Sequence, residues 1–134
     1  MKQEYLNIGA LAKASGVKAK MIRYYESVGI LPEAKRDTNN YRIYLPSDVD
    51  TLKFIKNAKA LSFDFEDIRK LLQLYSDENR QSAEVKALTL KHIDFITERI
   101  EEMEEVKETL TQLAERCAGD RQPDCLIIDS ILKK

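Results

Sequence analysis

The feature that most constrains the fold is a stretch from Ser82 to about Glu115 that contains neither glycine nor proline. Within this stretch the apolar side chains recur in steps of three and four residues. That spacing predicts one continuous helix, about 50 Å long, with a narrow apolar seam of the coiled-coil type. A small domain cannot bury so long a seam. We therefore expect a second copy of the chain to cover it, as an antiparallel coiled coil in a homodimer. The seam positions are 93, 96, 100, 103, 106, 110 and 113.

The two ends of the chain carry opposite charge. Residues 1–46 contain eight lysines and arginines against four acidic residues, whereas residues 81–134 contain eight against twelve. A basic first part and an acidic last part are typical of a protein that binds a polyanion such as DNA through its N-terminal half. The formal net charge of −1 averages these regions and indicates no partner by itself.

The N-terminal residues predict a helix-turn-helix. Two short helical patterns flank a break at Ser15-Gly16, with Ile8, Leu11 and Ala12 before it and Val17, Met21 and Ile22 after it. In DNA-binding proteins of this type the second helix enters the major groove. Here that helix would expose Lys18, Lys20, Arg23 and either Tyr24 or Tyr25. The pattern alone is a weak signal, because a surface helical hairpin with solvated lysines has the same spacing.

The next segment predicts a wing. Gly29 and Pro32 end the second helix, and a loop from Leu31 to Asn40 leads into the β-prone run Tyr41-Arg42-Ile43-Tyr44. A helix-turn-helix followed by such a hairpin is a winged helix. Its basic and aromatic residues, Arg36, Tyr41 and Arg42, suit phosphate contacts beside the groove.

A second helical hairpin follows the wing. One helix is expected to start at Pro46-Ser47-Asp48 with Ser47 or Asp48 as its cap, and another to start with Asp64 as its cap. The whole chain is then mainly α-helical and has four parts. These are a winged helix-turn-helix DNA-binding domain at 1–75, a linker at 76–81, a dimerisation helix at 82–115, and a cysteine loop with a short C-terminal helix at 116–134.

Both cysteines of the chain lie at the ends of one loop, Cys117-Ala-Gly-Asp-Arg-Gln-Pro-Asp-Cys125. The turn-forming residues between them could bring the two sulfurs together. We see no signal peptide and no apolar run of the roughly 18–20 residues that cross a bilayer, so we expect a cytoplasmic protein with no membrane partner. Thiols stay reduced in that compartment, which favours metal binding or redox work over a structural disulfide. The apolar piece from 126 to 132 would dock on the protein and report the state of the loop.

Several motifs carry a resemblance to a known family. They are Ile8-Gly9-Ala10-Leu11-Ala12, Gly16-Val17, Ile22-Arg23-Tyr24-Tyr25-Glu26, Gly29-Ile30-Leu31, Tyr41-Arg42-Ile43-Tyr44 and Leu61-Ser62-Phe63. Together they resemble the MerR transcription regulators over essentially the whole chain. The run Ser82-Ala83-Glu84-Val85-Lys86 and the cysteine loop are similar to those of the family's copper-efflux members. Where the family usually has glycine before the Tyr-Arg of the wing, this chain has Asn40, which tolerates left-handed backbone angles.

The resemblance implies how the protein works. It implies a homodimer on double-stranded promoter DNA that distorts the promoter spacer, so that RNA polymerase transcribes copper efflux and detoxification genes. Members that sense divalent ions typically have a cysteine at the start of the dimerisation helix, where this chain has Ser82, so Ser82 would influence metal selectivity. We see no catalytic constellation and expect no enzyme. The implied metal ligands are Cys117 and Cys125, and the implied DNA contacts are Lys20, Arg23, Tyr25, Arg36, Tyr41 and Arg42.

Coordination chemistry favours Cu(I) as the ligand of the loop, with Ag(I) and Au(I) as chemical mimics. Two thiolates fall short of the four ligands that Zn²⁺ prefers, whereas soft thiolates suit Cu(I). Two thiolates and a monovalent ion leave one negative charge, which loop amides or a helix N-terminus could stabilise. Two alternatives stay open. One is a sensor of Zn²⁺ or another divalent ion, with Asp120, Asp124 or His92 completing the site, and the other is a thiol-based redox-responsive regulator.

Overall fold

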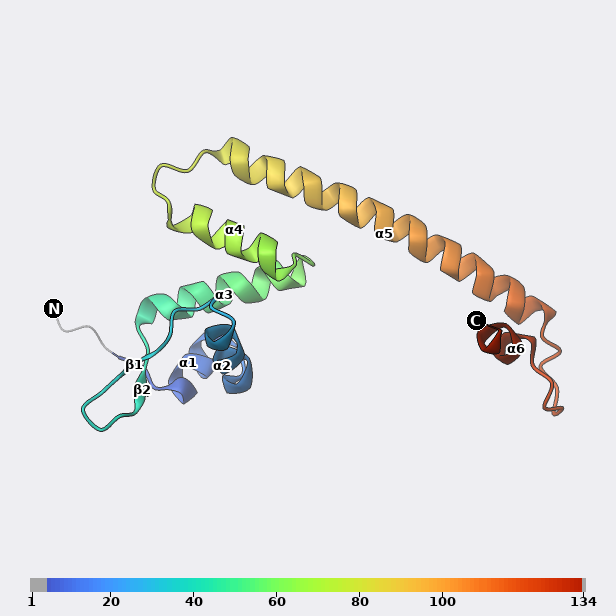
Figure 1. The fold of residues 1–134 in the computed structure, drawn as a ribbon, viewed down its shortest axis with the longest axis horizontal. Coiled ribbons are helices and arrows are strands. Elements are labelled where there is room, and N and C mark those ends of the chain that lie inside the picture. The colour runs from blue at the N-terminus through green and yellow to red at the C-terminus, as the bar shows by residue number, and fades with distance from the viewer. Residues whose placement is uncertain (1–4, 134) are drawn as a thin grey trace. The chain divides into compact units, whose positions relative to one another are not determined.

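The computed structural model describes residues 5–133 and is mainly helical, as predicted (Figure 1). Contacts divide the chain into two compact units, Met1–Lys86 and Ala87–Lys134, which are described separately below. We call the first unit the head. In chain order the elements are α1 (Ile8–Ser15), α2 (Ala19–Ser27), β1 (Lys35–Arg36), β2 (Arg42–Ile43), α3 (Pro46–Ala60), α4 (Phe65–Ser76), α5 (Ser82–Arg116) and α6 (Leu126–Leu132).

The helix-turn-helix forms at α1 and α2. Asn7 caps α1, because its side-chain oxygen accepts a hydrogen bond from the N–H of Ala10 at 2.8 Å. Gly16 ends the helix with a φ of 74°, and its N–H bonds back to the carbonyl of Ala12. This positive φ favours glycine at position 16, because side chains rarely adopt it.

The wing is a two-stranded antiparallel hairpin in which Lys35 pairs with Ile43 and Arg36 with Arg42. Its turn depends on two residues. Asn40 has a φ of 66°, as its tolerance of left-handed angles predicted, and the Asp37 carboxylate accepts hydrogen bonds from the N–H groups of Asn39 and Tyr41, each at 2.9 Å. The wing resemblance therefore holds despite the missing glycine.

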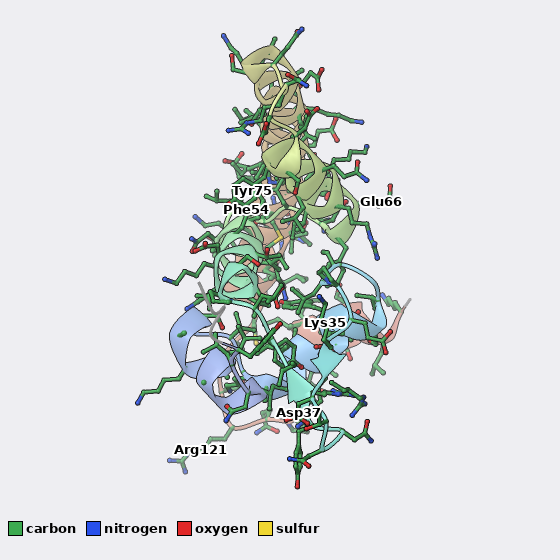
Figure 2. All side chains as sticks on the ribbon, turned by 90° about the vertical axis from the view of Figure 1, so that its left-hand side faces the viewer. Lys35, Asp37, Phe54, Glu66, Tyr75 and Arg121 are labelled. Atoms are coloured by element: carbon green, nitrogen blue, oxygen red, sulfur yellow. The ribbon has the colours of Figure 1, made fainter. Side chains whose placement is uncertain are left out.

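The second hairpin consists of α3 and α4. Asp48 does close the start of α3, but from the third helical position: its carboxylate accepts from the N–H of Leu45 at 2.9 Å, and Leu45, not Ser47, is the N-cap. Asp64 caps α4 as predicted, accepting from the N–H of Asp67 at 2.8 Å. The rings of Phe54 on α3 and Tyr75 on α4 stack with their centroids 5.2 Å apart and so join the two helices. Both residues are labelled in Figure 2.

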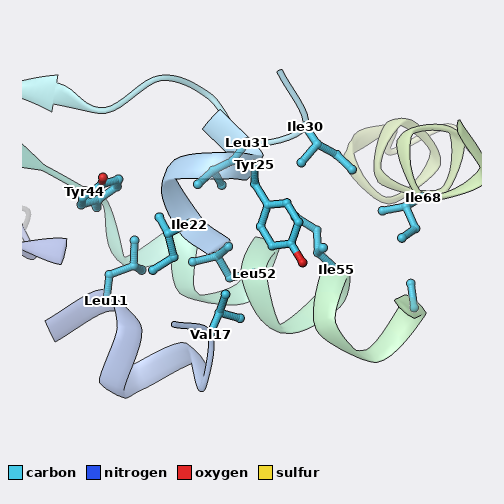
Figure 3. Close-up of a cluster of buried hydrophobic side chains, with 11 residues drawn as sticks. Leu11, Val17, Ile22, Tyr25, Ile30, Leu31, Tyr44, Leu52, Ile55 and Ile68 are labelled. Atoms are coloured by element: carbon cyan, nitrogen blue, oxygen red, sulfur yellow. The ribbon is translucent and has the colours of Figure 1, made fainter. Parts of the chain in front are cut away.

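One apolar core holds the head together. Its buried side chains come from α1, α2, α3, α4 and the segments around the wing, so the second hairpin packs against the winged part as expected (Figure 3). Such continuous burial is what makes a unit of this size stable by itself. The core members are Leu11, Val17, Ile22, Tyr25, Ile30, Leu31, Tyr44, Leu52, Ile55, Ala58 and Ile68.

The second unit is built on α5, a continuous helix of 35 residues, which the glycine-free and proline-free run predicted. Its seam side chains stay largely exposed in the single chain: Ile93 is 49% exposed, Ile100 53% and Met103 65%. An apolar hollow of about 360 Å³ follows the same helix, lined by Met103, Val106, Lys107, Leu110, Thr111 and Ala114. Within residues 5–133, none of the helices has the length and hydropathy to cross a membrane.

Candidate DNA interface and metal site

The recognition helix α2 presents basic residues outward. Lys20 and Arg23 are exposed, as is Lys18 at the N-cap position. Opposite them on the same helix, Ile22 and Tyr25 are buried in the core, which fixes which face of α2 is turned to solvent. The head thus places Lys20 and Arg23 where a groove of DNA could approach them.

Tyr25 does not fit its predicted role. Its side chain is 3% exposed and lies in the core of the head, as Figure 3 shows. Its ring meets that of Phe65 edge-on at 6.1 Å, and Nζ of Lys59 lies 5.8 Å from its centre. This burial argues against a DNA contact by Tyr25. The exposed member of the pair is Tyr24, at 44%, the other choice that the sequence had left open.

The wing carries the remaining predicted DNA contacts. Arg36 and Tyr41 are exposed, Tyr41 by 70%, and Arg42 is half-buried. Nη1 of Arg36 donates a hydrogen bond to the carbonyl of Asn40 at 3.0 Å, which holds the side chain along the hairpin. Arg42 instead reaches across to α2, where its Nη1 lies 3.8 Å from Oε2 of Glu26.

Glu26 belongs to a small buried polar group under the wing. Its side chain is 7% exposed, and the nearby hydroxyl of Tyr44 is buried as well. Burial, and then the Glu26 carboxylate, raise the pKa of Tyr44 to about 12, while Arg42 acts in the opposite direction. Among the residues that the structure describes, neither the Tyr44 hydroxyl nor Oε1 of Glu26 has a hydrogen-bond partner.

The two cysteines lie at the junctions of the loop with its flanking helices. Cys117 directly follows α5, and Cys125 is the N-cap of α6; both thiols are free and partly buried. The backbone N–H of Ile128 lowers the pKa of the Cys125 thiol, with further lowering from the N–H of Ile127 and from Cys117, while burial opposes it. A helix start that stabilises a thiolate suits a metal ligand.

The loop between the cysteines is a turn. Gly119 has a φ of 64°, and the Asp120 carboxylate accepts a hydrogen bond from the N–H of Gln122 at 2.9 Å. Asp120 thus already serves the turn. His92 is buried on α5, with its ring stacked near Phe95, and it lies 25 residues before Cys117, about 37 Å along a helix. In the part of the chain that is described, no three His, Cys, Asp or Glu side chains gather as a metal site of three or more protein ligands would need.

Comparison with known proteins identifies the family. A family model described as MerR HTH family regulatory protein matches residues 6–75, and one described as MerR, DNA binding matches residues 49–113. The chain belongs to the MerR family. The winged head of this MerR protein is therefore the DNA-binding part of a helix-turn-helix transcription regulator.

Several metal-related regulators are similar to this MerR protein over nearly their whole length. The transcriptional regulator HmrR of Sinorhizobium medicae is 44% identical over 128 residues, which cover 96% of this chain and 87% of HmrR. The regulator CueR of Salmonella typhimurium is 36% identical over 94% of this chain and 91% of CueR. The crystal structure of PbrR691 from Ralstonia metallidurans, in complex with lead(II), matches with a TM-score of 0.79 at 31% identity, covering 94% of this chain and 98% of PbrR691.

Two residues of this MerR head were missed by reasoning from sequence. Glu26 had no recognisable partner, because Arg42 is distant in the chain. Arg69 on α4 donates hydrogen bonds to the carbonyls of Val28 and of Gly29, the latter at 3.4 Å, and so binds the C-terminal end of the recognition helix. Forty residues separate these groups. The available signal for Glu26 was its place in the motif Ile22-Arg23-Tyr24-Tyr25-Glu26, whereas Arg69 lies in none of the motifs that carried the resemblance.

Proposed function

We propose that this MerR protein is a metal-responsive regulator that activates copper efflux and detoxification genes in the cytoplasm when it binds Cu(I). The observation that carries the proposal is the pair of free thiols, Cys117 and Cys125, at the two ends of one turn. The similarity to CueR and HmrR agrees with a metal-dependent role.

The donor set suits a monovalent soft ion. Two thiolates can hold Cu(I), Ag(I) or Au(I) in linear coordination, which is normal for these ions. The lowered pKa of Cys125 favours its thiolate form, and the α6 amides that lower it can also stabilise the negative charge left on such a complex. When bound, the ion would join the ends of the turn through two sulfur bonds. Cys117 and Cys125 are the residues that would hold it.

A sensor of divalent ions is the second candidate, and the likeness to the lead(II) complex of PbrR691 is the reason to consider it. Zn²⁺ prefers four ligands, and Asp120 is already engaged in its turn. His92 lies too far along α5 to reach the cysteines of its own chain. A further ligand would have to come from Asp124, which directly precedes Cys125, or from a second copy. The residue that the family resemblance places in the second copy is Ser82, whose hydroxyl is a poor substitute for a thiolate.

DNA binding is proposed to use α2 and the wing together. Lys20 and Arg23 on α2 would enter the major groove, and Arg36, Tyr41 and Arg42 would contact phosphates beside it. Tyr24 takes the place first given to Tyr25, because only Tyr24 is exposed. Double-stranded promoter DNA is thus bound by one head per half-site.

Homodimerisation is proposed to occur along α5. The seam of α5, which includes the apolar hollow at Met103, Val106 and Leu110, offers a surface that a second, antiparallel α5 would bury as a coiled coil. Metal binding would favour one arrangement of the two heads and so bend and untwist the promoter spacer for RNA polymerase, a deformation of a few kcal/mol. Its driving force is the difference in metal affinity between the two arrangements.

An anaerobic titration of the reduced dimer, read out by transcription from a bound promoter, tests this function. We expect Cu(I) and Ag(I) to activate at far lower free concentration than Zn²⁺ or Pb²⁺. Activation by Zn²⁺ alone would establish the divalent alternative instead. A parallel arm adds a thiol oxidant without metal, and activation there would indicate a redox-responsive regulator.

A further inference from the structure

The wing carries an unfavourable pair of like charges that its own hairpin does not resolve. Arg36 and Arg42 are directly opposed partners across β1 and β2. Like charges in this position repel each other and destabilise a hairpin. Arg36 is held by the Asn40 carbonyl, within the wing itself, so Arg42 must find its partner elsewhere.

That partner is Glu26, on the recognition helix. Oε2 of Glu26 lies 3.8 Å from Nη1 of Arg42, and the Glu26 side chain is 7% exposed against 38% for Arg42. The Glu26 side chain is therefore buried, whereas the Arg42 side chain stays partly open to solvent. An arginine held at one edge can still donate to a phosphate from the other, because its five donors lie in a rigid planar fork.

We propose that Glu26 is a positioning residue for DNA recognition: it fixes the guanidinium of Arg42 and thereby locks the wing to the recognition helix in the geometry that DNA requires. The inference rests on the proposed phosphate contact by Arg42. In this role the Glu26 carboxylate increases affinity for DNA despite its negative charge, because an arginine that is already oriented loses less conformational freedom when it binds.

Simple electrostatics makes the opposite prediction. Removing a carboxylate from a surface that approaches a polyanion should strengthen binding to any DNA, through reduced repulsion. The isosteric Glu26→Gln variant therefore separates the two explanations by the sign of its effect. Arg36→Gln supplies a matched control, because Arg36 carries the same charge at the opposed position and does not depend on Glu26.

The experiment measures the affinity of the full-length dimer for two duplexes of equal length by fluorescence anisotropy. One duplex is selected by the wild-type protein from a random pool, and the other is its shuffled sequence. We expect Glu26→Gln to weaken binding to the selected duplex about fivefold, a typical coupling between residues in contact. We also expect Glu26→Gln to reduce the slope of log affinity against log salt concentration by up to about two, which corresponds to one phosphate contact per head. The shuffled duplex should show no such loss.

The double variants decide the assignment. In an Arg42→Gln background Glu26→Gln should cause no further loss, whereas in an Arg36→Gln background its fivefold effect should persist. Tighter or unchanged binding by Glu26→Gln, or an equal loss in both backgrounds, would overturn the inference while leaving the proposed interface intact. A neutral Arg42→Gln would overturn the wing contact and the inference with it.

Folding is followed by the thermal midpoint of each variant. If Glu26→Gln does not fold, Glu26→Asp tests the same point, because it keeps the charge but shortens the reach by one methylene group. It should weaken the selected duplex in the same way and become neutral beside Arg42→Gln. If Glu26→Asp bound the selected duplex with full wild-type affinity, that result would contradict the positioning role of Glu26.

Discussion

The head and α5 differ in whether their apolar side chains have protein around them. In the head, Leu11, Ile22, Leu52 and Ile55 are each 0% exposed, whereas on α5 the seam residue Met103 is 65% exposed. Both regions carry regular helical apolar patterns in the sequence. The difference teaches that the head completes its core within one chain, while α5 leaves an apolar surface exposed, which fits the proposed pairing with a second copy.

The head and the C-terminal unit also differ in the part that each would play in regulation. The head contains capped helices, a tight wing and a buried core. The C-terminal unit contains a turn whose two cysteine thiols are free and form no disulfide with each other. A regulator needs both kinds of region, because a ligand can act only on a part whose conformation still has alternatives.

Replacement of either cysteine should produce the largest effect, and an effect restricted to the C-terminal unit. We expect Cys117→Ser and Cys125→Ser each to abolish metal-dependent transcription, because one remaining thiolate cannot hold a two-coordinate ion. Promoter binding should stay within about twofold, since the DNA-binding residues belong to the self-contained head. Transcription assays and DNA-binding isotherms on the same preparations measure both.

Asp124→Asn is the control for these cysteine variants. It removes a potential oxygen ligand from the same loop and should leave the metal response intact. Loss of the response in Asp124→Asn would support the divalent alternative, and loss of DNA binding in the cysteine variants would make the loop structural.

A substitution in the seam should separate the dimer without unfolding the head. Ile100→Ala removes a side chain that is 53% exposed in the single chain. In the dimer both copies lose it, so we expect association to weaken by about 4 kcal/mol in total. Analytical ultracentrifugation at micromolar concentration measures the change. Glu101→Ala, next to it, is the control, and equal association of Ile100→Ala and wild type would exclude the proposed seam.

A substitution in the core should do the reverse. Leu52→Ala creates a cavity at a fully buried position in α3 and should lower the free energy of unfolding of the head by about 3 kcal/mol. The C-terminal unit should keep its helicity and its ability to associate. Denaturant unfolding followed by helix content tests this, because the helix content that remains after the head unfolds reports on the C-terminal unit. If all helix content is lost in one transition, the two units unfold together.

The buried tyrosine should give the smallest effect, and only at alkaline pH. The pKa of Tyr44, raised to about 12 by burial and Glu26, exceeds its ordinary value of 10.0. The folded state then holds this proton more tightly, so the associated stability is complete below pH 10 and is lost as pH rises through about 12. At pH 11, half-way between the two pKa values, the loss amounts to about 1.4 kcal/mol.

Tyr44→Phe should lack this part of the alkaline destabilisation, while the exposed wing residue Tyr41 provides the control variant Tyr41→Phe. Unfolding free energies at pH 9, 10 and 11 measure the difference. Parallel curves for wild type and Tyr44→Phe would contradict the assignment of the raised pKa to Tyr44.

Local rules in the sequence determined most of the elements. The run free of glycine and proline determined α5, Gly16 determined the turn between α1 and α2, and Asp64 determined the start of α4. The turn at Asn40 followed from the backbone angles that this residue tolerates. Each of these depends on interactions within a few residues, which sequence patterns record directly.

Tertiary structure alone decided which side chains meet. Tyr24 and Tyr25 are adjacent and chemically identical, and only the packing of α2 against Phe65 and Lys59 makes Tyr25 a core residue. The pairing of Glu26 with Arg42 and the contact of Arg69 with the end of α2 join residues far apart in the chain. Such contacts depend on how helices pack, because through-space geometry is set by the whole core and not by local spacing.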